Sequence, residues 1–376
     1  MQTVTRIFPG RVAVALTLSF LASTTLAQTV VGPDETLSLT TSTAEDFLLE
    51  GGALRVNALT LSGEIALSAG CIIIRSQNAL TQIRPGSFRE ASIGPTELDG
   101  PIVGPGGLSI VNLSIDEVLL NGENTYLGET SIVTGSVVAT TAQSLGSTAA
   151  GTVVRGGALT VRFATDESFR IEAGTLRFDA GDFAPARSIT IAGGALHLPH
   201  RENIATPVVV EGTGGVVGFD FRGNTSWTGG STGTGSLQIE GPVSVDAPLL
   251  HDGDVIVAGA KLNAINAYTG KTIIMGRYEI DRPDVFGTSV TPIEIEDGEV
   301  TVRVLPNGQR GFIVRRGTLD VQTTVPIDAG IVLGGRFAAR IEGVGVFNGP
   351  IDYITTPGGG NAFLSSGTFN GPIRGT

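Results

Sequence analysis

The sequence has a single cysteine, Cys71, so the chain has no pair of cysteines for an internal disulfide. Cys71 follows Gly70 and precedes three isoleucines, and no basic or histidine residue stands within three positions of it to lower its pKa. This setting predicts a thiol packed in a strand rather than a reactive nucleophile.

Positive charge is also scarce. The 24 Lys and Arg residues face 36 Asp and Glu residues, and only Lys261 and Lys271 are lysines. A net charge of -12 disfavours nucleic acid and anionic membrane surfaces as partners, because both would be repelled. A net negative charge of this size needs no functional explanation, because it also keeps a protein soluble.

The sequence has no long apolar run. A short apolar stretch near the N-terminus has the pattern of a secretory signal. Arg6 and Arg11 precede an apolar stretch at 12–22, and Thr25-Leu26-Ala27 offers small residues before Gln28. We therefore predict export, a signal peptide at 1–27, cleavage between Ala27 and Gln28, and a mature region at 28–376.

Glycine is abundant, with 54 residues, and it introduces a recurring phrase of Gly, any residue, apolar, any residue, apolar. Alternation of this kind after a glycine predicts a strand that leaves a turn. The phrase begins at eleven glycines with a mean spacing of 20 residues: Gly135, Gly157, Gly174, Gly194, Gly215, Gly235, Gly253, Gly276, Gly298, Gly317 and Gly335.

A strand at nearly constant spacing is typical of stacked solenoid coils, and helical periodicity is almost absent. We therefore predict an all-β, single-stranded parallel β-helix (β-solenoid) with coils of about 20 residues. An antiparallel sandwich is the alternative fold, since it also places short strands at regular spacing.

Two longer segments, at about 104–146 and 233–287, share an Asn-x-Tyr-x-Gly-x-Thr centre. The first runs from Asn124 to Thr130 and closes with Leu145-Gly146, and the second runs from Asn266 to Thr272 and closes with Phe286-Gly287. Both segments resemble the passenger-associated transport repeat of autotransporter proteins. The second departs from that pattern by a longer stretch before its centre and by Phe at its close.

The resemblance implies a right-handed β-helix on, or released from, a Gram-negative cell surface, with repeats that assist passage across the outer membrane. Autotransporters that export themselves end in a membrane β-barrel, and this sequence shows no such region before Thr376. The expectation is thus an outer-membrane translocator that is supplied separately or missing, and a location outside the cell, on the outer-membrane surface or in the periplasm.

Some β-helix proteins act on polysaccharides, so paired acids and histidines are the candidates for chemistry. The candidates are Asp252 with Asp254, Asp281 with Asp284, His197 with His200, and His251 beside Asp252. The acids stand beside turn-forming Gly or Pro, and the histidines lack a nearby third group. We predict no catalytic, metal or cofactor-binding residues and no cofactor. The function expected is a structural or adhesive scaffold for a cell-surface, matrix or glycan ligand; the alternative is a polysaccharide lyase or hydrolase.

Overall fold

The computed structural model describes side chains for residues 97–112, 117–179, 188–199, 203–219, 225–308, 310–334, 338–354 and 362–375. Before these, it describes the backbone of strands at 4–7, 14–16, 29–31, 36–39, 47–56, 60–61, 65–74 and 96. The described residues form strands and turns with no helix, and therefore no helix that could span a membrane. The predicted all-β solenoid is confirmed, with about 12 turns of about 20 residues.

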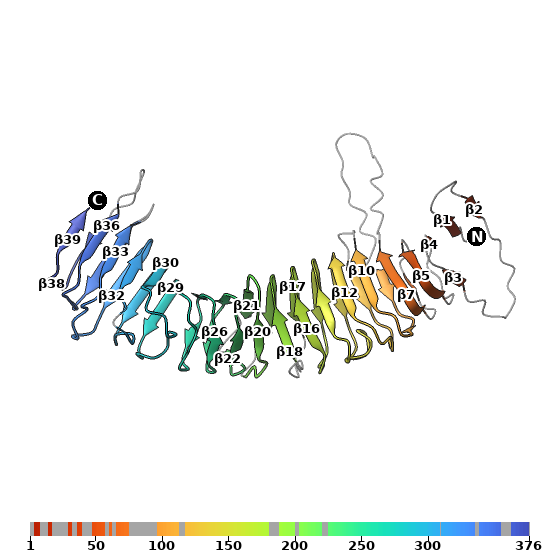
Figure 1. Ribbon diagram of the computed structural model, residues 1–376, viewed down its shortest axis with the longest axis horizontal. Coiled ribbons are helices and arrows are strands. Elements are labelled where there is room, and N and C mark those ends of the chain that lie inside the picture. The colour runs from red at the N-terminus through yellow and green to blue at the C-terminus, as the bar shows by residue number, and fades with distance from the viewer. Residues whose placement is uncertain are drawn as a thin grey trace, which may run out of the picture. The chain divides into compact units, whose positions relative to one another are not determined.

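The chain divides into two compact units, Met1–Ile189 and Thr190–Thr376. The strands of each unit stack side by side (Figure 1). Strand β1 pairs antiparallel with β2 and β4, whereas the pairs from β3 onward whose register is resolved are parallel. Parallel pairing excludes the antiparallel sandwich for these strands.

Two ladders of strands build the first unit. One ladder follows the order β2 (Val14–Leu16), β1 (Val4–Ile7), β4 (Thr36–Leu39), β5 (Phe47–Val56), β7 (Ile65–Ile74), β10 (Leu108–Asn112), β12 (Thr130–Thr134), β14 (Thr152–Val154) and β16 (Ser168–Ile171), with β3 (Thr29–Val31) on β5 and β9 (Ile102–Val103) on β7. The other comprises β6 (Thr60–Leu61), β8 (Thr96–Leu98), β11 (Val118–Leu120), β13 (Ser136–Ala139), β15 (Ala158–Val161) and β17 (Thr175–Phe178). Strand β18 (Ser188–Ile191) spans the boundary between the units.

The second unit has three faces. The first carries β20 (Val208–Val210), β23 (Ser231–Gly233) and β26 (Leu249–His251), and later β35 (Val346–Phe347) pairs with β38 (Thr368–Phe369). The second carries β19 (Ala195–Leu198), β21 (Gly215–Phe219), β24 (Leu237–Glu240), β27 (Val255–Ala258), β29 (Thr272–Ile280), β30 (Ile293–Val302), β31 (Phe312–Val314), β33 (Ile331–Gly334), β36 (Ile351–Ile354) and β39 (Ile373–Gly375). The third carries β22 (Thr225–Trp227), β25 (Val243–Val245) and β28 (Lys261–Leu262). Further along, the C-terminal half of β29 pairs with that of β30, and the strands that follow in order are β32 (Gly317–Val321), β34 (Ala339–Gly343) and β37 (Ala362–Leu364).

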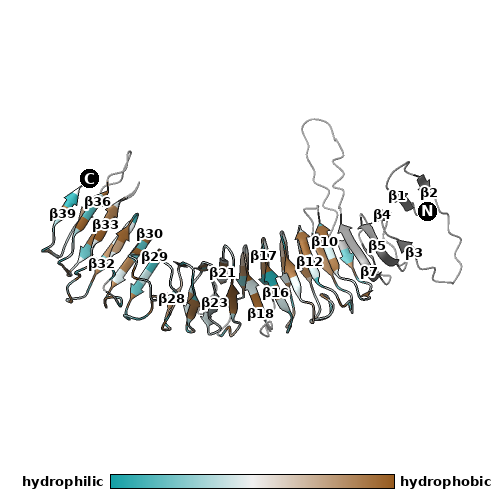
Figure 2. Ribbon diagram, viewed as in Figure 1, coloured by the Kyte–Doolittle hydropathy of each residue, from teal (hydrophilic) through white to brown (hydrophobic). Residues whose placement is uncertain are grey.

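Alternate residues of each strand point into the core, because successive side chains of a strand lie on opposite faces. Equivalent inward residues of successive coils stack in columns. In the second unit one column contains Leu196, Val217, Ile239, Val257, Ile274, Ile295, Val314 and Leu333, all at most 1% exposed. Hydrophobic residues of the stacked strands are visible in β10 and β12 (Figure 2).

The predicted glycine phrase marks the corners between faces. Gly157 precedes β15 with φ of 72°, and a Cβ there would overlap the carbonyl oxygen of Gly135 in the preceding coil. Only glycine therefore fits this corner without strain. The prediction needs one correction. Gly270, not Gly276, stacks under Gly253, while Gly276 turns the next corner, between the two halves of β29.

The predicted series therefore mixed glycines from two different corners of the coil. The 23 residues from Gly253 to Gly276 are close to the length of one coil, so the change of corner was not visible in the spacing. Gly335 lies outside the described residues. In the turn before β21 the glycines with positive φ are Gly212 and Gly214, not the predicted Gly215.

Candidate functional site: two buried Asn-Tyr-Thr clusters

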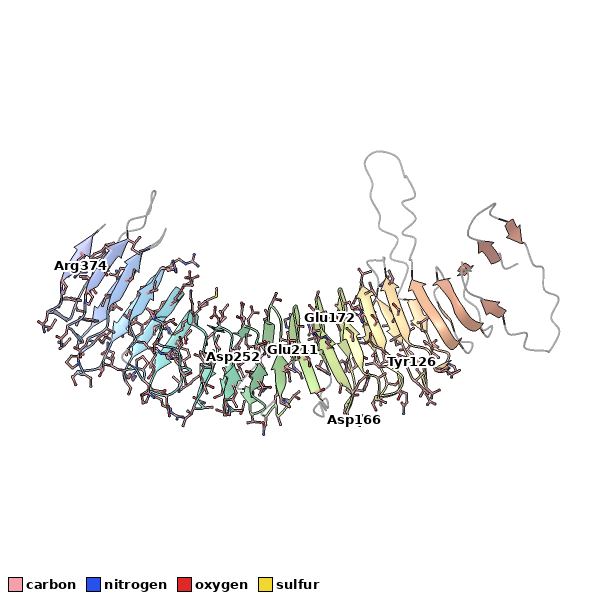
Figure 3. The ribbon with its side chains drawn as sticks, in the orientation of Figure 1. Tyr126, Asp166, Glu172, Glu211, Asp252 and Arg374 are labelled. Carbon is pink, nitrogen blue, oxygen red and sulfur yellow. The ribbon has the colours of Figure 1, made fainter. Side chains whose placement is uncertain are left out.

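The centre of the first transport-type repeat lies between β11 and β12, and its defining side chains point into the core. Asn124, Tyr126 and Thr130 are all at most 2% exposed. Residues 121–127 alternate between more exposed and buried positions, so the motif continues the period-two pattern of the strands around it. Figure 3 labels Tyr126.

Asn124 connects three successive coils. Its Oδ1 accepts a hydrogen bond from the Ile102 amide in the preceding coil at 2.8 Å. Its Nδ2 donates to the Ser144 carbonyl in the following coil at 2.6 Å. The side chain therefore satisfies two buried backbone groups that would otherwise lack a partner.

Tyr126 holds the same coil together and supports the next one. Its hydroxyl is hydrogen bonded to Thr130 Oγ1, and Thr130 Oγ1 donates to the Leu145 carbonyl at 2.9 Å. Burial raises the pKa of Tyr126 well above its usual value, so the phenol stays protonated. Gly146, at φ of 76°, lies against the ring, since a Cβ there would come within 2.6 Å of it.

The second repeat reproduces this arrangement in the other unit. Asn266 Oδ1 accepts from the Leu249 amide at 2.8 Å, and its Nδ2 donates to the Val285 carbonyl at 2.6 Å. Tyr268 and Thr272 hydroxyls lie 2.7 Å apart, and burial raises the pKa of Tyr268 to about 12.

The backbone around the two motifs also corresponds. Ser147 N–H donates to the Tyr126 carbonyl, and Thr288 N–H donates to the Tyr268 carbonyl, both at 2.9 Å. The closing glycine of the second repeat, Gly287, lies against the Tyr268 ring as Gly146 lies against Tyr126. Phe286, the departure from the family pattern, is buried like Leu145 and packs against Tyr278 with ring centroids 5.6 Å apart. The departure is thus accommodated in the core.

The neighbours of the two clusters differ in charge. In the second unit, His251 stacks on Tyr268 with ring centroids 6.0 Å apart, and Arg310 donates to the Gly287 carbonyl. Burial lowers the pKa of both His251 and Arg310. In the first unit the nearby ionisable group is Glu167, which accepts a hydrogen bond from Thr152 Oγ1.

Sequence reasoning missed Glu167. Beside Asp166 it looks like one of two exposed turn acids, and Asp166 is exposed (Figure 3). A signal was present, however. Glu167 stands two residues before Phe169 and four before Ile171, both inward residues of β16, so period-two alternation places Glu167 in the core as well.

The acidic pairs considered for catalysis are held in local contacts. Asp254 Oδ1 accepts from the Lys271 amide at 2.7 Å, and Asp252 is exposed. Asp281 pairs with Lys261 at 2.8 Å, and Asp284 lies 3.1 Å from Arg282. The structure shows no opposed pair of carboxylates at these positions.

The histidine candidates are not brought together. His197 is exposed on β19, and His200 lies outside the described residues. His251 is 1% exposed and its Nδ1 lies 2.9 Å from Ser231 Oγ in the core, whereas its sequence neighbour Asp252 faces solvent. A buried Ser-His pair of this kind has no access to a substrate. No group of three or more His, Cys, Asp or Glu residues that could hold a metal occurs among the residues described.

Two further predictions fall largely outside the described residues. The backbone of Cys71 lies in β7, as predicted, but its side chain is not described. The predicted cleavage site at Ala27 and Gln28 is likewise not described, so the signal peptide stays a prediction.

No protein-family model, curated protein or solved structure matches the chain. The transport-repeat resemblance therefore depends on the two sequence motifs alone.

Proposed function

We propose that this chain is an exported structural or adhesive scaffold of the autotransporter-passenger type, on or released from the cell surface, with transport repeats that act through folding. The solenoid fold is compatible with a surface scaffold of this kind. The observation that carries the proposal is the reproduction of one set of cross-coil hydrogen bonds at Asn124 and Asn266, 142 residues apart.

Burial constrains how such repeats could assist passage. The motif side chains of both clusters are at most 4% exposed, so a translocator could not read them on the folded chain. Each Asn completes its bonds only when the preceding and following coils are in place. The clusters therefore stabilise three coils at once, and on this proposal the folding of those coils outside the membrane resists backward movement of the chain.

The test is export of the full chain in a Gram-negative host that carries a suitable translocator. The wild-type chain is expected at the cell surface or in the medium, measured by protease accessibility in intact cells. The Asn124→Ala, Asn266→Ala double variant is expected to accumulate inside the cell envelope. Asn121→Ala and Asn370→Ala serve as matched controls, because these Asn side chains make exposed or part-buried hydrogen bonds and no fully buried one.

Export of the double variant at the wild-type level contradicts a folding role for the repeats. Retention of the wild-type chain in the cytoplasm contradicts the passenger proposal as a whole. A screen of the purified chain against common polysaccharides addresses the enzymatic alternative, and any clear release of reducing ends or unsaturated products would replace the scaffold proposal.

A further inference from the structure

The first cluster continues into a buried polar column that ends in a carboxyl group. Thr130, the partner of Tyr126, stacks directly on Thr152 in the parallel pair β12–β14. Thr152 Oγ1 in turn donates to Glu167 Oε1. The column thus runs from Tyr126 through Thr130 and Thr152 to Glu167, and each of these residues is at most 1% exposed.

Among the residues that the structure describes, no cation contacts the Glu167 carboxyl. Within the described residues, the side-chain contact of its carboxyl is the Thr152 hydroxyl, and the charged or titratable groups that act on it are Asp166 in its own segment and Tyr126 in the first cluster. Asp166 is an acid and Tyr126 a phenol, so neither supplies the positive charge that would favour a carboxylate.

Glu294 provides the contrast within the same chain. It is the other described Glu that is nearly buried, at 6% exposed, and Lys271 and Arg315 approach its two oxygens at 3.1 and 3.3 Å. A buried carboxylate is normally paired in this way, because an unpaired charge in the core is costly. Glu167 has no such cation among the described residues, and Thr152 and Thr130 connect it to Tyr126 of the first cluster.

We propose that Glu167 makes the stability of the first cluster depend on pH: the protonated carboxyl is accommodated in the column, and the carboxylate weakens the coil from Thr152 to Ile171 and the Tyr126–Thr130 contact above it. The second cluster has Arg310 and His251 beside Tyr268 instead of a buried acid, so it lacks this control. The inference deepens the proposed function by adding regulation to one of its two repeats.

Burial raises the pKa of Glu167 from 4.5 to about 7. Because the folded value lies above the unfolded one, the stabilisation is complete below about pH 4.5 and is lost as the pH rises through 7. The first cluster is therefore expected to be tighter in acid than at neutral or alkaline pH.

The test is hydrogen exchange on the full chain at pH 5 and pH 8, corrected for the intrinsic exchange rate. Amides of β12, β14 and β16 are expected to exchange at least about tenfold faster at pH 8, within a limit of about 70-fold that a shift from 4.5 to about 7 allows between these two pH values. Amides of the second cluster are expected not to exchange faster at pH 8, because the lowered pKa of the buried His251 acts in the opposite direction and destabilises that cluster in acid. Glu167→Gln is expected to abolish the difference, and Glu172→Gln, an exposed acid on the same strand region, is expected to retain it.

Carbon-13 NMR titration of the wild-type Glu side chains gives a second measurement that needs no variant. A Glu carboxyl that titrates near pH 7 supports the proposal, and titration of all Glu carboxyls below about pH 5 overturns it. A pH difference in exchange that persists in Glu167→Gln also overturns it. Normal export of the Asn124→Ala, Asn266→Ala variant would remove the folding role of the repeats but would leave this pH dependence standing.

Discussion

Asn124→Ala is the substitution that tests most directly what the first cluster contributes. It leaves the Ile102 amide and the Ser144 carbonyl without partners, and both residues are fully buried. A buried polar group that loses its partner costs about 1–3 kcal/mol. The two groups together predict a loss of about 2–6 kcal/mol in the stability of the coils that they join.

The assay must be local, because a solenoid is stabilised coil by coil and need not unfold in one step. Hydrogen exchange resolved by residue should show the loss at residues 102–147, with little change in the second unit. Asn121→Ala is the control. Its Nδ2 donates to Asp99 on the exposed surface, where water can replace it, and its Oδ1 accepts from Thr140 Oγ1, which can still donate to the Leu120 carbonyl. No buried group is left without a partner, so we expect a loss below about 1 kcal/mol.

Equal losses for Asn124→Ala and Asn121→Ala would refute the reasoning, since the buried bonds of Asn124 would then contribute no more than the exposed and part-buried bonds of Asn121. Asn266→Ala repeats the experiment in the second unit, where the Leu249 amide and the Val285 carbonyl lose their partners. Exchange should then become faster in the second unit, with little change in the first.

Three further substitutions separate the other contributions to the fold. Gly157→Ala adds a backbone clash at a residue with left-handed φ and should lower the midpoint of thermal unfolding. Gly308 has a similar φ of 80° but open space for a Cβ, so Gly308→Ala should lower the midpoint less. Equal shifts would argue against the clash. Arg155→Ala removes two exposed ion pairs, with Glu129 and Glu172, and should cost less than about 1 kcal/mol in urea unfolding, with a smaller effect at high salt. Tyr268→Phe removes one buried hydroxyl and should destabilise the second cluster by about 1 kcal/mol, measured by local exchange; an unchanged rate would assign its role to the ring alone.

The solenoid could be predicted because its physical cause is local. A glycine that turns a corner and an alternating strand after it both appear in a window of five residues, as at Gly157 and β15. The assignment of corners could not be predicted, because coil length varies. Val137 pairs with Leu159 after 22 residues, whereas Leu159 pairs with Leu176 after 17.

The candidate site was predicted in part. The motif identified Asn124, Tyr126 and Thr130, but it could not show that Asn124 reaches both neighbouring coils, because its partners are backbone groups that any residue supplies. The partners of Glu167 were hidden for a related reason. Thr152 stands 15 residues away, and only the register of β14 on β16 brings the two together.

The burial of Asn beside the aliphatic columns has a physical reason in the stacking itself. A column such as Val217, Ile239 and Val257 would tolerate a slip of two residues, since Leu237 faces the core from the same strand as Ile239. Asn266 does not tolerate a slip, because both its oxygen and its amide must meet specific backbone groups in two different coils. A buried polar side chain that fixes register has precedent in coiled coils. One such residue in each unit therefore supplies what the aliphatic columns lack, a single preferred alignment of successive coils.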